Sequence, residues 1–464
     1  MGRAARVALA VTAFVLPALL PGARPAWTAT RAPLPADAAR ISPLAGLWDV
    51  SCRSATCAAA GYYTDSAGGP QALLLTGHGS AWTAARAPLP AGAAQDSATQ
   101  VPAIASVACR SGSACVAVGD YTDSSGHLQG LVLSGYGSAW TAIQAPLPDG
   151  AAASPDAVLS HVACPSAAGC VATGYYTSDT PAKIRHALVL AGHGSSWTAI
   201  QAPLPPGAGP NANAGLWDVT CPSATACVGA GFYGRHGLLL TGHGSSWSAA
   251  EAPLPAGAGA SSQSGLYEVT CATPTACVAA GSYDVRPGTG DGLLLTGHGS
   301  SWSATEAPLP AGAAARPDPD ITGVSCGSAT ACVAAGYYAG PAGQEQGLLL
   351  ARHGPSWTAR RAPLPAGAGT DSSAYLNGVS CGSATACVAA GYYTDAAGNE
   401  QALLLSGHGS SWTARRAPLP AGAGTDPGAH LNGVTCPSPA ACVAAGGYTD
   451  SSGQAQGLLL ARPG

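Results

Sequence analysis

The sequence predicts an all-β fold, an eight-bladed β-propeller built from four-stranded antiparallel blades. Three observations lead to this prediction. A cysteine pair and a tryptophan recur about every 55 residues along the chain, which indicates one supersecondary unit copied many times. Each copy holds four short extended runs separated by turn residues, which is typical of a propeller blade. The two ends of the chain carry complementary fragments of one copy.

The four runs can be followed in the copy at residues 374–420. The first run, 376–381, ends at a cysteine and is followed by a turn of small polar residues. The second run, 387–393, has small residues on both sides and leads into an Asp-x-x-Gly turn. The third run, 402–405, is continuously apolar, as expected for a strand buried on both faces. After a Gly-His-Gly turn, the fourth run, 412–420, is ended by its prolines.

The fragments at the two ends predict how the ring closes. The chain after the leader opens with a lone fourth run, Trp27 to Pro35, and it finishes with the first three runs of the eighth copy. Together they make one blade, so we expect the N-terminal strand to complete the last blade and hide edges that would otherwise be open. A parallel β-helix has much shorter coils, and an open solenoid needs no complementary ends.

The cysteine pairs are predicted to form eight disulfides. The two members of a pair flank the first turn of a blade, so they face each other across a hairpin at a distance that a disulfide accepts. The alternative, metal binding or redox chemistry, does not suit eight copies in an exported protein. The expected bridges are Cys52–Cys57, Cys109–Cys115, Cys164–Cys170, Cys221–Cys227, Cys271–Cys277, Cys326–Cys332, Cys381–Cys387 and Cys436–Cys442.

Residues 1–26 are predicted to be a secretion signal, and residues 27–464 a single propeller domain. Two arginines precede an apolar stretch from Val7 to Leu20, which is short for a membrane span but suits the core of a signal peptide. An uncleaved anchor is the alternative. We expect a secreted mature chain without a membrane span, in agreement with the disulfides.

Composition argues against several classes of function. The net charge is −4, only 9% of the 464 residues are charged, and Lys183 is the one lysine. Such a surface lacks the basic stripe that nucleic-acid binding requires. The recurring histidines of the Gly-His-Gly turns belong to separate blades and are interpreted as turn residues in left-handed geometry. The Asp-x-x-Gly turns offer one carboxylate each, too few for calcium. We expect no metal and no cofactor.

Two families resemble this chain. The turn Ser406-Gly407-His408-Gly409-Ser410-Ser411-Trp412 is distantly similar to the Asp-box hairpin of sialidase-type propellers, with histidine at the Asp position and one residue fewer. The stretch Thr220 to Gly231 followed by Ser246-Trp247-Ser248 resembles secreted actinobacterial Cys-pair/Trp repeat proteins. The resemblance covers residues 27–464 and implies a propeller and export. It implies no reaction.

Candidate site residues lie just before the first cysteine of a copy, and we expect them near the face opposite the cysteine turns. Aromatic–acid pairs occur in copies 1, 4 and 5, and a histidine takes the acid position in copy 3. Aromatic rings beside carboxylates at a channel mouth would suit a sugar-like ligand. The alternative is that these residues only pack against the next blade. The candidates are Trp48, Asp49, His161, Trp217, Asp218, Tyr267 and Glu268.

Three classes of function remain open. No nucleophile–base pair, metal cluster or phosphate loop stands out, so our leading hypothesis is a non-catalytic monomer that binds a glycan, a cell-wall polymer or a surface protein at the cell surface. The alternative is a glycoside hydrolase or lyase that uses two of Asp49, Asp218 and Glu268 as acid and base. A structural repeat of a spore or wall layer is the third class. Basic edge residues in copies 6, 7, 8 and 1 would suit an anionic partner; the alternative is that they only prevent strand addition.

Overall fold

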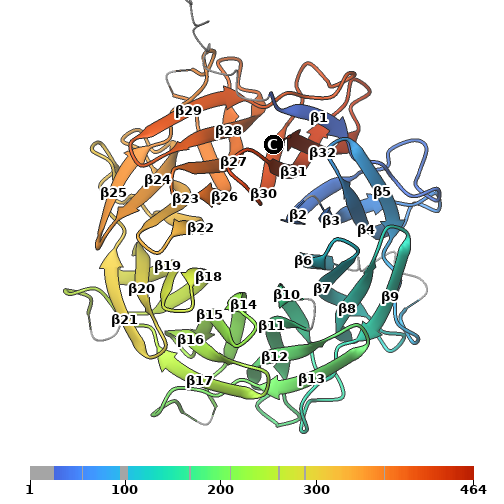
Figure 1. Ribbon diagram of the computed structural model, residues 1–464, viewed down its shortest axis with the longest axis vertical. Coiled ribbons are helices and arrows are strands. Elements are labelled where there is room, and N and C mark those ends of the chain that lie inside the picture. Colours follow the sequence, from blue (N-terminus) through green and yellow to red (C-terminus); the bar gives the residue numbers. More distant parts are fainter. Residues whose placement is uncertain are drawn as a thin grey trace, which may run out of the picture.

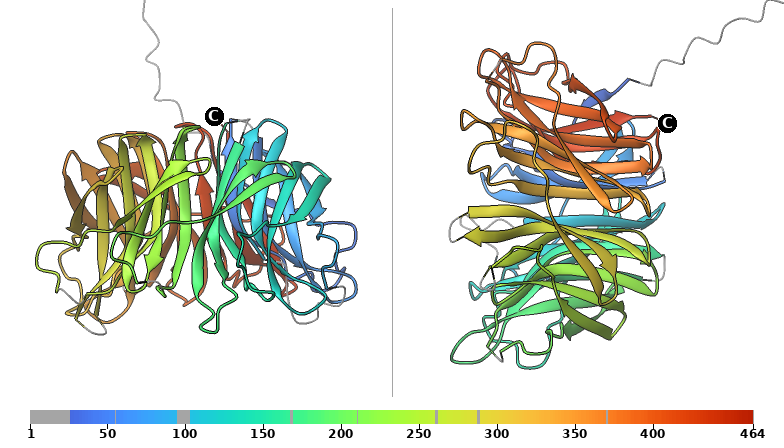
Figure 2. Two further views of the ribbon diagram at one scale, coloured as in Figure 1. Left: turned by 90° about the horizontal axis from the view of Figure 1, so that it is seen from below. Right: turned by 90° about the vertical axis from the view of Figure 1, so that its left-hand side faces the viewer.

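The computed structural model describes residues 26–54, 56–94, 103–166, 169–209, 211–259, 262–286, 289–369 and 371–463. They form eight four-stranded antiparallel sheets around a central opening, with the first strand of each sheet innermost (Figure 1). Seen from the side, the turns lie on two opposite faces of a short disc (Figure 2). The predicted eight-bladed propeller is therefore confirmed. Residues 1–25 of the predicted secretion signal lie outside the described residues.

The strands follow one pattern in every blade, and their bounds are as follows. Blades 1 to 3 are β2 (Gly46–Arg53), β3 (Thr56–Thr64), β4 (Pro70–His78), β5 (Ala81–Arg86); β6 (Ala103–Ser111), β7 (Ala114–Thr122), β8 (Leu128–Tyr136), β9 (Ala139–Gln144); β10 (Val158–Ser166), β11 (Gly169–Thr177), β12 (Arg185–His193), β13 (Ser196–Gln201). Blades 4 to 6 are β14 (Ala214–Ser223), β15 (Ala226–Tyr233), β16 (His236–His243), β17 (Ser246–Glu251); β18 (Ser264–Thr273), β19 (Ala276–Arg286), β20 (Thr289–His298), β21 (Ser301–Glu306); β22 (Asp320–Ser328), β23 (Ala331–Ala339), β24 (Glu345–His353), β25 (Ser356–Arg361). Blade 7 is β26 (Ala374–Ser383), β27 (Ala386–Thr394), β28 (Glu400–His408), β29 (Ser411–Arg416), and blade 8 is β30 (His430–Thr435), β31 (Cys442–Thr449), β32 (Ala455–Arg462), β1 (Thr28–Arg31).

The core lies between blades, and the third strand of each blade contributes to both of its sides. In β28, Leu403 and Leu405 pack with side chains of blade 6, whereas Leu404 packs with side chains of blade 8. All three leucines are fully buried, because alternate side chains of a strand point to opposite faces. This explains the continuous apolar runs of the sequence.

No helix in the described part of the chain is long and apolar enough to cross a membrane.

The ring closes as predicted. Strand β1 pairs with β32 in antiparallel register, from Thr28 opposite Ala461 to Arg31 opposite Leu458, so the first and last strands lie side by side (Figure 1). Beyond the strand, the backbone N–H of Ala32 donates to the carbonyl of Gly457 at 2.9 Å. The N-terminal strand is thus the outer edge of the last blade.

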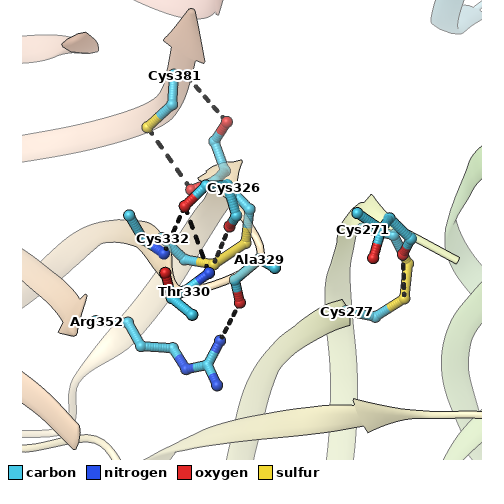
Figure 3. The surroundings of a disulfide bond; sticks show 12 residues. Cys271, Cys277, Cys326, Ala329, Thr330, Cys332, Arg352 and Cys381 are labelled. Carbon is cyan, nitrogen blue, oxygen red and sulfur yellow. Dashed lines mark hydrogen bonds between the residues drawn. A yellow bond between two sulfur atoms is a disulfide. The ribbon is translucent and has the colours of Figure 1, made fainter. Parts of the chain in front are cut away.

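All eight predicted disulfides are present, and each joins the two cysteines that flank the first turn of its blade. Their Cα atoms are 3.9–4.1 Å apart. Figure 3 shows that these hairpins also contact one another. The backbone N–H of Cys381 donates to Ser325 Oγ of the preceding blade at 3.0 Å, and Arg352 donates to the carbonyl of Ala329 at 3.2 Å within the Cys326–Cys332 turn.

The histidine-containing turns correct one expectation. The histidines do not take left-handed geometry. They end the third strand, and the glycine that follows takes the positive φ, as in Gly79 (56°) and Gly409 (50°), since glycine has no Cβ to clash there. The indole N–H of Trp412 donates to the carbonyl of Gly409 at 3.1 Å. Among the described residues, no cluster of three or more His, Cys, Asp or Glu could hold a metal ion.

The Asp-x-x-Gly turns are held by their aspartates, as turn chemistry predicts. One oxygen of Asp65 accepts hydrogen bonds from the backbone N–H groups of Ala67 and Gly69, at 3.0 and 2.9 Å, and the other accepts from Gln71 Nε2 at 2.7 Å. Asp123, Asp395 and Asp450 make the equivalent contacts in their blades. These carboxylates are therefore engaged within their own turns.

Candidate functional site

A β-bulge in the innermost strand of each blade positions the candidate residues. In blade 1 the register with β3 shifts between Leu47 and Asp49, so Trp48 is the extra residue. A bulge interrupts the alternation of a strand and re-aims its side chains. As a result Trp48 and Asp49 are both at least partly exposed, although they lie between the buried Leu47 and Val50. The same shift occurs at Trp217 in blade 4 and at Tyr267 in blade 5.

Aromatic rings gather where the innermost strands begin and the second strands end, which is the face opposite the disulfides. Trp48 stacks on Tyr62 with ring centroids 5.1 Å apart, and Trp217 stacks on Phe232 at 5.7 Å. Across the ring, Tyr375 stacks on Tyr392 at 4.8 Å. Tyr175 and Tyr337 each meet a neighbouring blade's ring edge-on, at 6.2 and 4.9 Å. We call this set the aromatic mouth: Trp48, Tyr62, Tyr175, Trp217, Phe232, Tyr267, Tyr337, Tyr375 and Tyr392.

Only three members of the aromatic mouth were predicted from the sequence. The second-strand members were missed, although a signal for them exists. The second strand carries a repeated Gly-aromatic-Tyr string, as at Gly61-Tyr62-Tyr63. Because side chains alternate along a strand, Tyr63 is buried between blades at 0% exposure, and Tyr62 points to the opposite face of the sheet, where it stacks on Trp48.

Two of the cavities at the aromatic mouth lie on either side of blade 5. One, of about 350 Å³, lies between blades 4 and 5, and its lining includes Trp217, Phe232, Arg235, Tyr267 and Asp284. The other, of about 590 Å³, lies between blades 5 and 6, and its lining includes Tyr267, Glu268, Asp318 and Asp320. Tyr267 borders both cavities, and its hydroxyl is 3.0 Å from Ser282 Oγ. Both cavities combine aromatic walls with polar groups.

Two of the three acidic candidates, Asp49 and Asp218, hold neighbouring blades together. Asp49 accepts hydrogen bonds from the backbone N–H groups of Val50 at 2.8 Å and of Val107 in the next blade at 2.9 Å. Asp218 does the same with Val219 at 2.7 Å and with Val269 at 2.6 Å. One oxygen of each carboxylate bonds within its own blade, and the other bonds to the next blade.

In blades 7 and 8 a neutral side chain plays the equivalent part. Nδ2 of Asn377 and of Asn432 donates to a backbone carbonyl of the next blade, in both cases at 2.8 Å. These asparagines occupy the bulge position itself, whereas Asp49 and Asp218 follow it. Inter-blade bonding is therefore the role that the contacts assign to the two aspartates.

His161 completes the polar cluster inside the channel. Its Nδ1 is 2.9 Å from Asp218 Oδ1 and 3.2 Å from the carbonyl of Val219. Burial alone would lower the pKa of His161, but the charge and hydrogen bond of Asp218, with the charges of Asp49 and Glu268, outweigh it and raise the pKa to about 9. Burial and the charges of Asp218 and Asp49 raise the pKa of Glu268 well above its usual value, although His161 opposes the shift.

The structure divides the predicted site in two. Trp48, Trp217 and Tyr267 lie at the aromatic mouth, as expected. Asp49 and His161 instead line a cavity of about 330 Å³ together with Cys52, Cys109 and Cys164, so they are reached from the disulfide side of the channel. The expectation that all candidates sit near the opposite face is wrong for these two residues, whose side chains line the cavity beside the cysteines. Glu268 shares a cavity with Tyr267.

We predict that stability falls as the pH rises from about 6.5 to 9. A histidine whose folded pKa is raised stabilises the folded state fully below its unfolded pKa of about 6.5, and the contribution is lost as the pH passes the folded value of about 9. Because the side chain is 39% exposed, solvent screening reduces the contribution to about 1–2 kcal/mol. Guanidinium unfolding at pH 6 and pH 9 measures it.

His161→Asn should flatten this pH dependence, whereas His243→Asn, at an exposed position outside the cluster, should leave it unchanged. The raised pKa of Glu268 acts in the same direction as that of His161. Because His161 also lowers the pKa of Glu268, the comparison is repeated in a Glu268→Gln background, where only the histidine titrates. Equal pH slopes for the wild-type protein and His161→Asn would contradict the assignment.

The chain matches no protein-family model and no curated protein. Among solved structures it is similar to a fucose-specific lectin from Aleuria aurantia, at 13% identity over 70% of this chain and 98% of that chain, with a TM-score of 0.32. It is also similar to the β-propeller domain of the Trilobed protease from Pyrococcus furiosus, at 7% identity over 91% and 96% of the two chains, with a TM-score of 0.40. Trypanosoma rangeli sialidase gives 10% identity over 81% and 57%, with a TM-score of 0.38. Such identities and TM-scores are too low to transfer a ligand or an activity.

Proposed function

We propose that this protein is a secreted, monomeric, non-catalytic β-propeller that binds a glycan at its aromatic mouth. The observation that carries the proposal is the exposure of large rings on the bulges, where Trp48 is 51% exposed and Tyr267 is 42% exposed. Large exposed apolar side chains grouped at a cavity mark interaction sites. The eight disulfides support the secreted location.

The cavity between blades 4 and 5 has the mixed character that a sugar needs. The rings of Trp217, Phe232 and Tyr267 give flat apolar walls for the C–H faces of a pyranose. Arg235, Gln263 and Asp284 on the same lining give donors and acceptors for its hydroxyl groups. A cavity of about 350 Å³ falls in the size range of small-molecule sites.

The engagement of the aspartates supports a binding role over a catalytic one. A general acid or base must reach the proton that it transfers. The oxygens of Asp49 and Asp218 already accept backbone hydrogen bonds, and those bonds join successive blades. Using either carboxylate for catalysis would break contacts that hold the ring together.

We predict that Trp217→Ala weakens glycan binding by about tenfold or more, because a buried aromatic contact in a binding site is commonly worth 1–2 kcal/mol or more. A glycan array on the mature, oxidised protein identifies a ligand, and titration calorimetry then compares the variant with the wild-type protein. His243→Ala, at the other end of the same blade, is the matched control and should bind like wild type. Undiminished binding by Trp217→Ala would remove the aromatic mouth as the site.

One observation favours a carbohydrate-active enzyme as the second candidate. Glu268 has a raised pKa, as a general acid requires, and it shares a cavity with Tyr267. Hydrolysis or cleavage of an oligosaccharide that bound the array, lost in Glu268→Gln with binding retained, would establish this alternative. Intact oligosaccharide after long incubation with the wild-type protein would exclude it for that ligand.

A further inference from the structure

We propose that the outer edges of blades 6, 7 and 8 form a basic strip that docks a linear anionic glycopolymer carrying phosphate or carboxylate groups. The strip lies on strands β25, β29 and β1, which follow one another around the circumference (Figure 1). Its members are Arg31, Arg360, Arg361, Arg415 and Arg416, and all five are exposed. The strip is a different surface from the aromatic mouth, and it stands independently of the proposed glycan site.

No carboxylate neutralises the strip by a direct ion pair among the described residues. The contrast is Arg86, at the equivalent place in blade 1, which lies 3.2 Å from Asp37 Oδ2. Arg416 and Arg31 interact electrostatically with Asp395 and Asp450. However, both of those carboxylates already accept the hydrogen bonds of their own turns.

Blade 6 lacks even this partial compensation. Gly340 of blade 6 occupies the position that Asp395 has in blade 7. In both blades a buried glutamine follows six residues later. As a consequence, Gln346 Nε2 has no hydrogen-bond partner, whereas Gln401 Nε2 donates to Asp395 at 2.9 Å. The nearby Arg361 therefore faces Tyr338 without an aspartate in that turn. Blade 6 therefore has no turn aspartate to offset the charges of Arg360 and Arg361.

The need to prevent strand addition at the blade edges does not explain why the residues of the strip are positive rather than negative or neutral. Any polar or charged residue on an edge strand discourages strand addition. At the same place blades 4 and 5 use Glu251 and Glu306, which accept hydrogen bonds from Tyr233 and Tyr283 at 2.6 and 3.1 Å. Blade 3 uses Gln201, which accepts from Tyr176 at 3.0 Å. Apart from Arg86 of blade 1, which is paired with Asp37, positive charge at this place is confined to three successive blades. Blades 2 to 5 have a neutral or negative residue there.

The chemistry of the strip defines its partner. Arginine presents a planar fork of donors that matches phosphate and carboxylate oxygens. Charges distributed over three adjacent blades suit a chain with regularly repeated anionic groups better than one compact anion. Attraction between exposed charges falls as salt screens them. The partner is therefore a flexible anionic polymer, and binding should weaken with ionic strength.

The test compares two variants that each lower the net charge of the edge strands by two. Arg360→Gln/Arg415→Gln removes charge from the strip, and Gln201→Glu/Thr305→Glu adds negative charge on exposed edge positions of blades 3 and 5. Binding of the mature, oxidised proteins to poly(glycerol phosphate) and to polygalacturonate is measured by biolayer interferometry at 50 and 300 mM NaCl, with dextran as the neutral polymer. Unchanged circular dichroism and melting temperature establish that each variant is folded.

The first variant should bind about threefold to tenfold more weakly than wild type at low salt, and the second should bind like wild type. Binding to the phosphate polymer alone, to the uronate polymer alone or to both identifies the anionic group and supports the proposal. Absence of binding to both polymers at 50 mM NaCl overturns it, as does an equal loss in the two variants. Equally tight binding of a DNA duplex would show general attraction to polyanions and would also overturn it.

Discussion

Deletion of residues 26–35 is expected to destroy the cooperative folding of the ring. The segment supplies strand β1, and its loss exposes the edge of β32 from Leu458 to Ala461. It also removes Trp27, which is buried against blades 7 and 8, and the packing of Leu34 between blades 8 and 1. Loss of one buried tryptophan commonly costs about 3–5 kcal/mol, which is already a large part of a typical folding free energy of about 5–15 kcal/mol.

Differential scanning calorimetry and light scattering measure this effect. We expect the melting temperature to fall by about 10 °C or more and the deleted protein to aggregate, because an unpaired apolar edge strand recruits other chains. A synthetic peptide of residues 26–35 added in trans should restore part of the lost stability, whereas a scrambled peptide of the same composition should not. A monomeric deletion variant with the wild-type melting temperature would show that the ring does not depend on this closure.

Reduction of the eight disulfides is expected to have an effect at least as large. In the chain-entropy model, closing a loop of about seven residues contributes roughly 2 kcal/mol. Eight such loops in separate blades should contribute nearly additively, up to about 15 kcal/mol. The blades bury many small side chains, such as Ala389 and Ala390, whose burial contributes little free energy per residue. The bridges should therefore decide whether the reduced chain remains folded.

Guanidinium unfolding with and without reductant measures the total, and the Cys271→Ala/Cys277→Ala double variant measures one bridge. The double variant should lose about 2 kcal/mol with the other seven pairs intact. A thiol assay on the unreduced wild-type protein should detect no free thiol, in agreement with the complete pairing of the described cysteines. Identical unfolding midpoints for the oxidised and reduced proteins would contradict a stabilising role.

Features that depend on local spacing were predictable from the sequence. The apolar run around Leu404 predicted a strand buried on both faces, and the lone run after Trp27 predicted the strand that closes the ring. The first interpretation follows from the alternation of side chains along a strand. The second follows from counting the strands in each copy of the repeat. The same holds for Cys381 and Cys387, since two cysteines that flank a tight turn must face each other. The left-handed geometry assigned to the histidines was wrong, because the neighbouring glycines adopt it at a lower steric cost.

The candidate site was predictable only in part. The aromatic–acid pairs were found, but the pair at Trp48 and Asp49 was interpreted as one site unit. In the structure one bulge sends the tryptophan to the aromatic mouth, and it places the aspartate in a bond to Val107 of the next blade. Nothing in a single copy of the repeat reports a hydrogen bond between residues 58 positions apart.

The amino-acid sequence by itself determined the blade, its disulfide and the closure of the ring, because each depends on residues that are close in the chain or repeated at a fixed period. The tertiary structure alone decided which side chains face each other across neighbouring blades. It placed His161 beside Asp218, gathered the tyrosines of the second strands around the mouth, and left the five arginines of the basic strip without ion pairs among the described residues. The physical reason is that a bulge of one residue turns a side chain to a different surface. Its new neighbours there belong to another blade, far away in the sequence.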